Sequence, residues 1–120
     1  MHEATIVSSL LQILETQARQ HGVTRIGRVT VRIGRLRAVE PQQLRLCFEM
    51  FAEETVAEGA ELMLISVPVR ARCSRCRHEF AVKRYRFDCP LCGGGDVEVI
   101  SGQELYIESF EPAEGPASHR

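Results

Sequence analysis

Apolar and polar residues alternate along the chain with two different periods, which predict helices and strands in turn. Residues 4–21 carry an apolar stripe with the spacing of one helical face, and Gly22 stands where such a helix would end. Residues 28–33 alternate strictly, which predicts a half-buried strand closed by Gly34. The stripe consists of Ile6, Val7, Leu10, Leu11, Leu14 and Ala18.

Both periods return further along the chain. A second helix is expected to begin near Pro41, since proline is tolerated in a first turn, and to fade before Gly59. Residues 60–67 predict a second strand, which Pro68 stops, and residues 105–110 predict a third. The second helix is expected to bury one face, made of Leu44, Cys47, Phe48 and Phe51.

This order of elements predicts an α+β fold, with two helices on a roughly three-stranded sheet that the last strand completes. We expect residues 1–69 and 102–111 to form this α+β domain. Residues 70–101 would then be a cysteine-rich module inserted between two strands of the sheet. Residues 112–120 are rich in proline, alanine and glycine and are expected to be a disordered tail.

The length of 120 residues fits a small domain with a metal-stapled module and excludes a large multidomain enzyme. The longest uninterrupted apolar stretch is the four residues Leu62–Ile65, whereas a transmembrane helix needs about 18. The first residues lack the basic region of a secretory signal. We therefore expect a cytoplasmic protein that has no membrane partner.

Four of the five cysteines form two C-x2-C pairs with twelve residues between them. In a reducing compartment, clustered cysteines are more often metal ligands than disulfides. Two residues between thiolates let a tight turn place both sulfurs on one metal, and two such turns supply the ligands of a closed structural zinc site. An Fe–S cluster or a redox dithiol is the alternative. The predicted zinc ligands are Cys73, Cys76, Cys89 and Cys92.

The residues around these cysteines predict a zinc ribbon. Residues 80–82 and 85–87 have the composition of two short hairpin strands, and residues 93–95 are glycines that let the chain leave the second turn. His78 follows the first pair closely, but with four cysteines present we expect it beside the site or in solvent. Cys47, alone in the second helix, is interpreted as a small buried core residue.

Charge is unevenly spread, although the formal net charge is only −1. Seven basic residues stand between residues 70 and 92, whereas residues 96–114 hold six acidic residues and no basic one. The two segments either pack on each other or present a basic surface to a partner. The basic residues are Arg70, Arg72, Arg75, Arg77, Lys83, Arg84 and Arg86.

The first three residues, Met1, His2 and Glu3, offer a second metal site. The amine of Met1, the deprotonated amide nitrogen of His2 and its imidazole form fused chelate rings around one ion. Such planar, nitrogen-rich coordination suits Ni(II) or Cu(II), whereas zinc prefers tetrahedral geometry. The carboxylate of Glu3 is placed to orient the imidazole or to add charge.

Met-His-Glu leading into an amphipathic helix, followed by the two C-x2-C pairs, resembles the HypA/HybF hydrogenase maturation factors over residues 1–111. The resemblance implies that Met1, His2 and Glu3 bind nickel and that the four cysteines bind structural zinc. It implies a nickel metallochaperone that delivers Ni(II) to the precursor of the [NiFe]-hydrogenase large subunit, together with a HypB-type GTPase. It also implies the insertion of the zinc module into a small α+β domain.

Two other functions are consistent with the composition. A zinc-ribbon adaptor could bind nucleic acid or an acidic protein through the basic residues of the module, although those residues could also offset the charge of the thiolates. Nucleic acid is not the expected partner, because aromatic residues near the module are few and the rest of the chain is acidic. An enzyme is not expected, since no nucleophile–base pair and no phosphate-binding glycine loop is recognisable.

Overall fold

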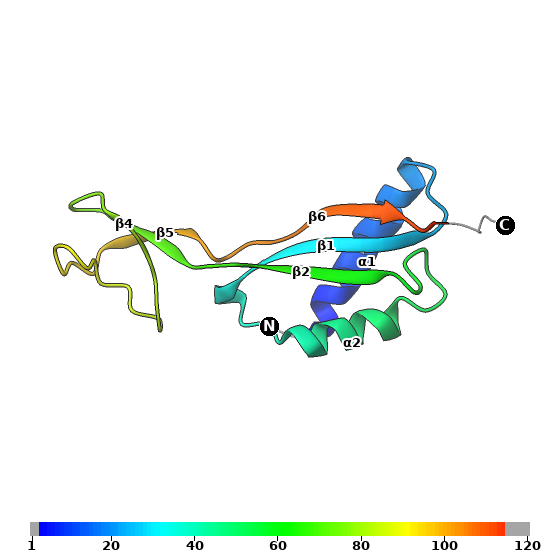
Figure 1. The fold of residues 1–120 in the computed structure, drawn as a ribbon, viewed down its shortest axis with the longest axis horizontal. Helices are drawn as coiled ribbons and strands as arrows, with labels where there is room; N and C mark the ends of the chain where they lie inside the picture. The colour runs from blue at the N-terminus through cyan, green and yellow to red at the C-terminus, as the bar shows by residue number, and fades with distance from the viewer. Residues whose placement is uncertain (1–2, 115–120) are drawn as a thin grey trace. The chain divides into compact units, whose positions relative to one another are not determined.

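The computed structural model of the chain describes residues 3–114, which divide into two compact units. The first unit contains residues 3–32, 39–65 and 106–114, and the second contains residues 33–38 and 66–105. Two helices and two three-stranded sheets make up the fold, so the predicted α+β class is confirmed (Figure 1). The expected domain boundaries, after residues 69 and 101, lie a few residues from these unit boundaries and stay a prediction.

The first helix, α1 (Glu3–Gln20), buries all six residues of the predicted stripe. It ends in a Schellman motif, in which the N–H of Val23 donates to the oxygen of Ala18 (2.8 Å) and the N–H of Gly22 to that of Arg19 (3.3 Å). Gly22 has a φ of +69°, which glycine adopts without the steric penalty of a side chain. The predicted helix and its terminating glycine are therefore confirmed.

The second helix, α2 (Pro41–Phe51), begins at the predicted proline. The residue before it, Glu40, caps the helix, since its carboxylate accepts a hydrogen bond from the N–H of Gln43 (3.0 Å). A capping carboxylate also has a favourable interaction with the positive end of the helix dipole. The start of α2 is thus stabilised by residues adjacent in sequence.

The buried face of α2 is narrower than predicted. Leu44 and Phe48, four residues apart, are buried, with exposed fractions of 0% and 2%. Cys47 is only half-buried and Phe51 is 42% exposed, so the expectation that Cys47 belongs to the core is wrong. Positions next to each other on a helix differ by about 100°, which places Cys47 at the side of the stripe that Leu44 and Phe48 define.

The first sheet has the strand order β2-β1-β6, so the last strand completes it as predicted. The strands are β1 (Ile26–Gly34), β2 (Glu61–Val67) and β6 (Leu105–Pro112). The central strand β1 buries four apolar side chains, and a 3-10 turn, η1 (Arg35–Arg37), follows it. The segment expected to be a disordered tail is described as far as residue 114. Pro112 ends β6, and the N–H of Ala113 donates to the oxygen of Arg25 (2.9 Å).

Ion pairs connect the strands of the first unit. Arg28 on β1 pairs with Glu61 on β2 (3.1 Å) and lies 3.9 Å from Glu111 on β6. Arg32, also on β1, pairs with Glu108 on β6. Opposite charges on neighbouring strands favour this register. Two acidic residues of the last strand are therefore neutralised by β1 rather than by the basic module.

The second unit contains the other sheet, with the strand order β4-β3-β5. The strands are β3 (Arg70–Cys73), β4 (Glu79–Ala81) and β5 (Val97–Ser101), and both neighbours run antiparallel to β3. Ala71 lies opposite Phe80 on one side and Val99 on the other. Ala71 and Phe80 are buried together with Cys73 and Cys89 in one small cluster, against which Val82 and Val97 pack.

The predicted hairpin between residues 80–82 and 85–87 is wrong. The first segment does contribute a strand, β4, but its partner is β3, and residues 85–87 are not a strand. Arg84 and Tyr85 have φ values of 54° and 60°, so the chain reverses within four residues and forms only an isolated bridge between Lys83 and Arg86. The second partner of β3 is β5, a strand that the sequence analysis missed.

The end of β1 approaches the backbone before β6 very closely. The N–H of Gly34 donates to the oxygen of Glu104 (2.7 Å), and the N–H of Leu36 donates to that of Gly102 (2.8 Å). A Cβ at position 34 would lie 2.0 Å from the carbonyl carbon and oxygen of Gly102. Only glycine fits at this crossing.

Replacing Gly34 with alanine is therefore expected to destabilise the protein by about 3 kcal/mol, because the backbone must separate and lose hydrogen bonds. Urea unfolding followed by circular dichroism measures the loss. The matched control is Gly95→Ala, since a Cβ there meets nothing within 4 Å and should change stability by less than about 0.5 kcal/mol. Equal urea midpoints of unfolding for Gly34→Ala and the native protein would contradict the close approach of the two backbone segments.

Candidate metal centre

Two turns with the same hydrogen-bond pattern hold the two cysteine pairs. In the first, the oxygen of Cys73 accepts from the N–H of Arg77, and the N–H of Cys73 donates to the oxygen of His78 (both 2.9 Å). In the second, Cys89 makes the equivalent bonds with Gly93 and Gly94 (both 2.8 Å). The repeated pattern shows that each C-x2-C pair forms the tight turn that its spacing predicted.

Both turns require a left-handed residue four positions after the first cysteine. Gly93 fills this position in the second turn with a φ of +74°. Arg77 fills it in the first turn with a φ of 69°, a conformation that is disfavoured for a residue with a side chain. The first turn is thus held in a conformation that its own sequence does not favour, and the contacts around it must compensate.

The four sulfur atoms come together as predicted. All four lie within 4.8 Å of one another, and the closest pairs join the two turns, Cys73 to Cys92 and Cys76 to Cys89, each with an Sγ–Sγ distance of 3.5 Å. A tetrahedron of sulfurs about 2.3 Å from a central ion has edges of about 3.8 Å. A disulfide would need about 2.05 Å. The arrangement therefore fits a four-coordinate metal and no disulfide.

Hydrogen bonds and neighbouring sulfurs separate the pKa values of the cysteines. The N–H groups of Cys76 and Arg75 lower the pKa of Cys73 to about 6, and that of Cys92 lowers the pKa of Cys89. The His78 N–H also lowers the pKa of Cys76, yet the Cys89 sulfur raises it, and the pKa of Cys76 is about 11. Four negative sulfurs cannot coexist at this distance unless a cation is bound among them.

The site is closed on its inner side. Cys73 and Cys89 are buried in the core of the second unit, whereas Cys76 and Cys92 are exposed. His78 is not part of the four-sulfur group, and its ring stacks on Phe80 with a centroid distance of 6.1 Å. The expectation that His78 lies beside the site is consistent with this position. A fully thiolate set has the composition of a structural zinc site rather than of a catalytic one.

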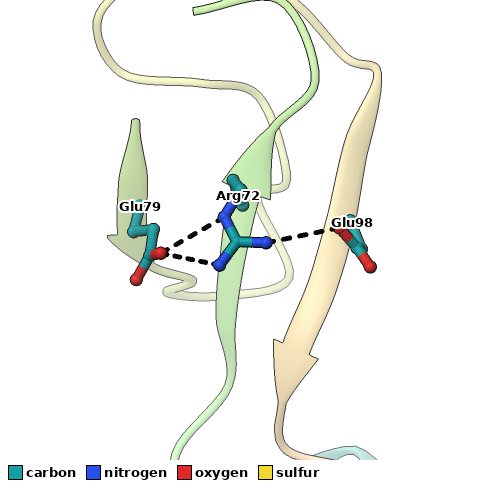
Figure 2. A network of polar contacts seen from close by, with 3 residues as sticks. All are labelled: Arg72, Glu79 and Glu98. Carbon is teal, nitrogen blue, oxygen red and sulfur yellow. Dashed lines mark hydrogen bonds and ion pairs between the residues drawn. The ribbon is translucent and has the colours of Figure 1, made fainter. Parts of the chain in front are cut away.

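An ion-pair network positions the strand that ends at Cys73 (Figure 2). Arg72 on β3 donates through Nε and Nη2 to one oxygen of Glu79 on β4 (3.2 and 2.8 Å), and its Nη1 lies 3.6 Å from Glu98 on β5. These hydrogen bonds lower the pKa of Glu79 and raise the pKa of Arg72. The sequence analysis counted Arg72 only as one of the basic residues. Arg72 and the two glutamates carry opposite charges on adjacent strands, and this pattern is the signal that could have identified the network.

The second predicted metal site is only partly visible. Met1 and His2 lie outside the described residues, so the structure places Glu3 alone. One oxygen of Glu3 accepts a hydrogen bond from the backbone N–H of Glu40 (3.2 Å), the residue that caps α2. The beginning of α1 is thus linked to the beginning of α2. The sequence analysis did not identify Glu40, although its place before Pro41 marks a helix start.

No helix among residues 3–114 is both long and apolar enough to cross a membrane.

Comparison with known proteins gives a consistent result. The family model for HypA, described as a hydrogenase/urease nickel incorporation metallochaperone, matches residues 1–112. The hydrogenase maturation factor HypA of Acidithiobacillus ferrooxidans is 40% identical over 111 residues, which cover 92% of this chain and 98% of the relative. That of Chlorobium limicola is 41% identical over 115 residues, covering 96% of this chain and 99% of the relative.

Solved structures agree with the sequence relatives. The solution structure of the Ni metallochaperone HypA from Helicobacter pylori is similar with a TM-score of 0.70 and 32% identity, covering 95% of this chain and 100% of that one. The matched region contains Met1, His2 and Glu3 as well as all four clustered cysteines. The predicted resemblance is confirmed, and the chain belongs to the HypA family of nickel metallochaperones in hydrogenase maturation.

Proposed function

We propose that this protein binds Ni(II) through Met1, His2 and Glu3 and delivers it to the [NiFe]-hydrogenase large-subunit precursor. The observation that carries the proposal is the match of the nickel-incorporation family over residues 1–112, which includes the Met-His-Glu triplet. Nickel is the cargo in this proposal, and its ligands are the Met1 amine and the amide and imidazole nitrogens of His2. These donors favour the square-planar geometry of Ni(II) over the tetrahedral geometry of zinc.

The position of Glu3 supports a nickel site at this end of α1. Its carboxylate is held by the Glu40 N–H, which fixes the residue that follows the proposed chelate. A fixed carboxylate adds negative charge beside the cation and orients the imidazole of His2. Because the His2 amide must lose its proton to bind, acidification would release the nickel.

The four-cysteine cluster is proposed to hold structural Zn(II). The core cluster around the cysteines of the second unit contains four buried residues, including Cys73 and Cys89, which is too few for a stable fold of this size. Zinc binding contributes about 10–16 kcal/mol in comparable small modules. The ligands we propose, Cys73, Cys76, Cys89 and Cys92, therefore act in folding rather than in chemistry.

The proposed partners are a HypB-type GTPase and the large-subunit precursor. The chain carries no nucleotide-binding glycine loop, so any step coupled to GTP hydrolysis would take place on the partner. We propose that the protein is a carrier and not an enzyme. A cytoplasmic location is proposed as well, since a reducing compartment keeps the four thiols available for metal.

Loss of one zinc ligand should empty the cluster. The variant Cys76→Ser is expected to contain almost no zinc, whereas the native protein contains about one ion per chain, because serine is a poor zinc ligand. Elemental analysis of the purified protein measures the ratio. The control is Cys47→Ser, which changes the one cysteine outside the cluster and should keep its zinc. Full zinc occupancy in Cys76→Ser would show that the assigned ligands are wrong.

Zinc affinity should rise with pH. In the metal-free protein the thiol of Cys76, with a pKa of about 11, is protonated near neutral pH, whereas Cys73, with a pKa of about 6, is mostly thiolate. Zinc must therefore displace at least the proton of Cys76, and affinity should increase about tenfold per pH unit for each proton released. The stabilisation by zinc is correspondingly lost as the pH falls. Competition with a chromophoric chelator measures this slope, and an affinity independent of pH would contradict it.

Nickel binding should depend on the first two residues. Calorimetric titration of the zinc-loaded native protein is expected to give about one Ni(II) per chain, and His2→Ala should lower the affinity at least about tenfold, since it removes one of three nitrogens. A protein with one residue added before Met1 should lose affinity similarly. The control is His21→Ala, an exposed histidine after α1, which should bind as the native protein does. Native-like binding by either altered N-terminus would refute the chelate.

A further inference from the structure

The segment between β4 and the second cysteine turn carries a cluster of exposed cations around one tyrosine. We call residues Lys83, Arg84, Tyr85 and Arg86 the basic loop. All four are exposed, and Tyr85 is 71% exposed, the largest fraction of any aromatic residue in the described part of the chain. Figure 1 shows this segment leaving the sheet of the second unit after β4 and returning toward the following turn. The loop belongs entirely to that unit.

The backbone of the basic loop is not the one that its residues favour. Arg84 and Tyr85 both have left-handed φ values, 54° and 60°, and the N–H of Arg86 donates to the oxygen of Lys83 (3.0 Å). Two consecutive left-handed residues in a tight turn are the pattern for which Asn-Gly is preferred. The arginine and tyrosine therefore work against the stability of the turn. Backbone strain of this kind is typical of functional segments.

The cations of the basic loop make no ion pair with any of the acidic residues that the structure describes. Glu79 and Glu98 both form ion pairs with Arg72 (Figure 2), and Glu108 and Glu111 form ion pairs with arginines of β1. Among residues 3–114, none of the three cations of the loop is within 4.0 Å of a carboxylate oxygen. The two charged segments do pack on each other at β3 and β5, where Arg72 pairs with Glu98, but the cations of the basic loop take no part in this packing.

A basic residue outside the loop lies beside the cysteine cluster. The basic side chain beside the cluster is that of Arg75, since a Cβ on Gly94 would lie 3.4 Å from both Arg75 Cδ and Cys92 Sγ. Among residues 3–114, the side chains of Lys83, Arg84 and Arg86 make no hydrogen bond or ion pair.

We propose that the basic loop is a docking site for an acidic segment of a partner protein. Arginine and tyrosine are enriched at protein interfaces and at their energetic centres, and in the basic loop Arg84 and Arg86 flank the exposed Tyr85 in sequence. Carboxylates pair with the guanidinium groups, and an apolar partner side chain covers the tyrosine ring. A single turn offers no extended cationic track, which disfavours nucleic acid. The proposal adds a contact surface that does not depend on nickel binding.

The decisive variants separate docking from folding. Arg84→Asn combined with Tyr85→Gly introduces the dipeptide that this turn prefers, so it should fold at least as stably while removing two docking side chains. Arg84→Glu combined with Arg86→Glu reverses the charge. The matched control is Arg19→Glu combined with Arg45→Glu, two exposed arginines on α1 and α2. All variants should keep native zinc content and nickel affinity, which makes the outcome independent of the metal sites.

The probe is a fluorescent, glutamate-rich peptide of about twelve residues with one central phenylalanine, titrated into the zinc-loaded full chain near physiological salt. We expect measurable binding by the native protein and the control, and at least about tenfold weaker binding by both loop variants. Three results would overturn the proposal. They are no binding by the native protein, equal weakening by the control, and tighter binding of a single-stranded oligonucleotide of similar length than of the peptide.

Discussion

Mutual repulsion between four thiolates is the constraint on which the second unit depends. The sulfurs lie within 4.8 Å of one another, and the pKa values of Cys73 and Cys76 are driven apart, to about 6 and about 11. The proposed zinc ion would remove this conflict and at the same time join the two cysteine turns. The small core of Ala71, Cys73, Phe80 and Cys89 then packs on the inner side of the cluster. With zinc as the proposed ligand, metal binding and folding of this unit would be one process.

Ion pairs within each unit join neighbouring strands. Arg28 and Arg32 hold acidic residues of the neighbouring strands in the first sheet, and Arg72 holds Glu79 and Glu98 in the second. The cations of the basic loop take part in none of these pairs. A net charge close to zero therefore conceals a local excess of positive charge, which is the physical basis for assigning a partner to the basic loop.

Sequence patterns with a fixed period or spacing predicted the structure best. The helical stripe, Gly22, Pro41 and the meeting of the four cysteines are all confirmed, because each depends on residues close together in sequence. The prediction of a hairpin strand at residues 85–87 was wrong, since two left-handed residues that are not glycine give no recognisable turn signal. The prediction that Cys47 is buried was wrong, because helical periodicity does not say how wide the packed face of a helix is. The bond between Glu3 and Glu40 depends on tertiary contact, which no local pattern contains.

Nickel and zinc are proposed to occupy two chemically different sites, one of nitrogen donors at residues 1–3 and one of four sulfurs. X-ray absorption spectroscopy on the protein loaded with both metals tests this most directly, because each element is observed separately. We expect a zinc spectrum with four sulfurs at a Zn–S distance of about 2.3 Å, and a nickel spectrum with nitrogen or oxygen neighbours and no sulfur. Sulfur bound to nickel, or a zinc shell with fewer than four sulfurs, would contradict it.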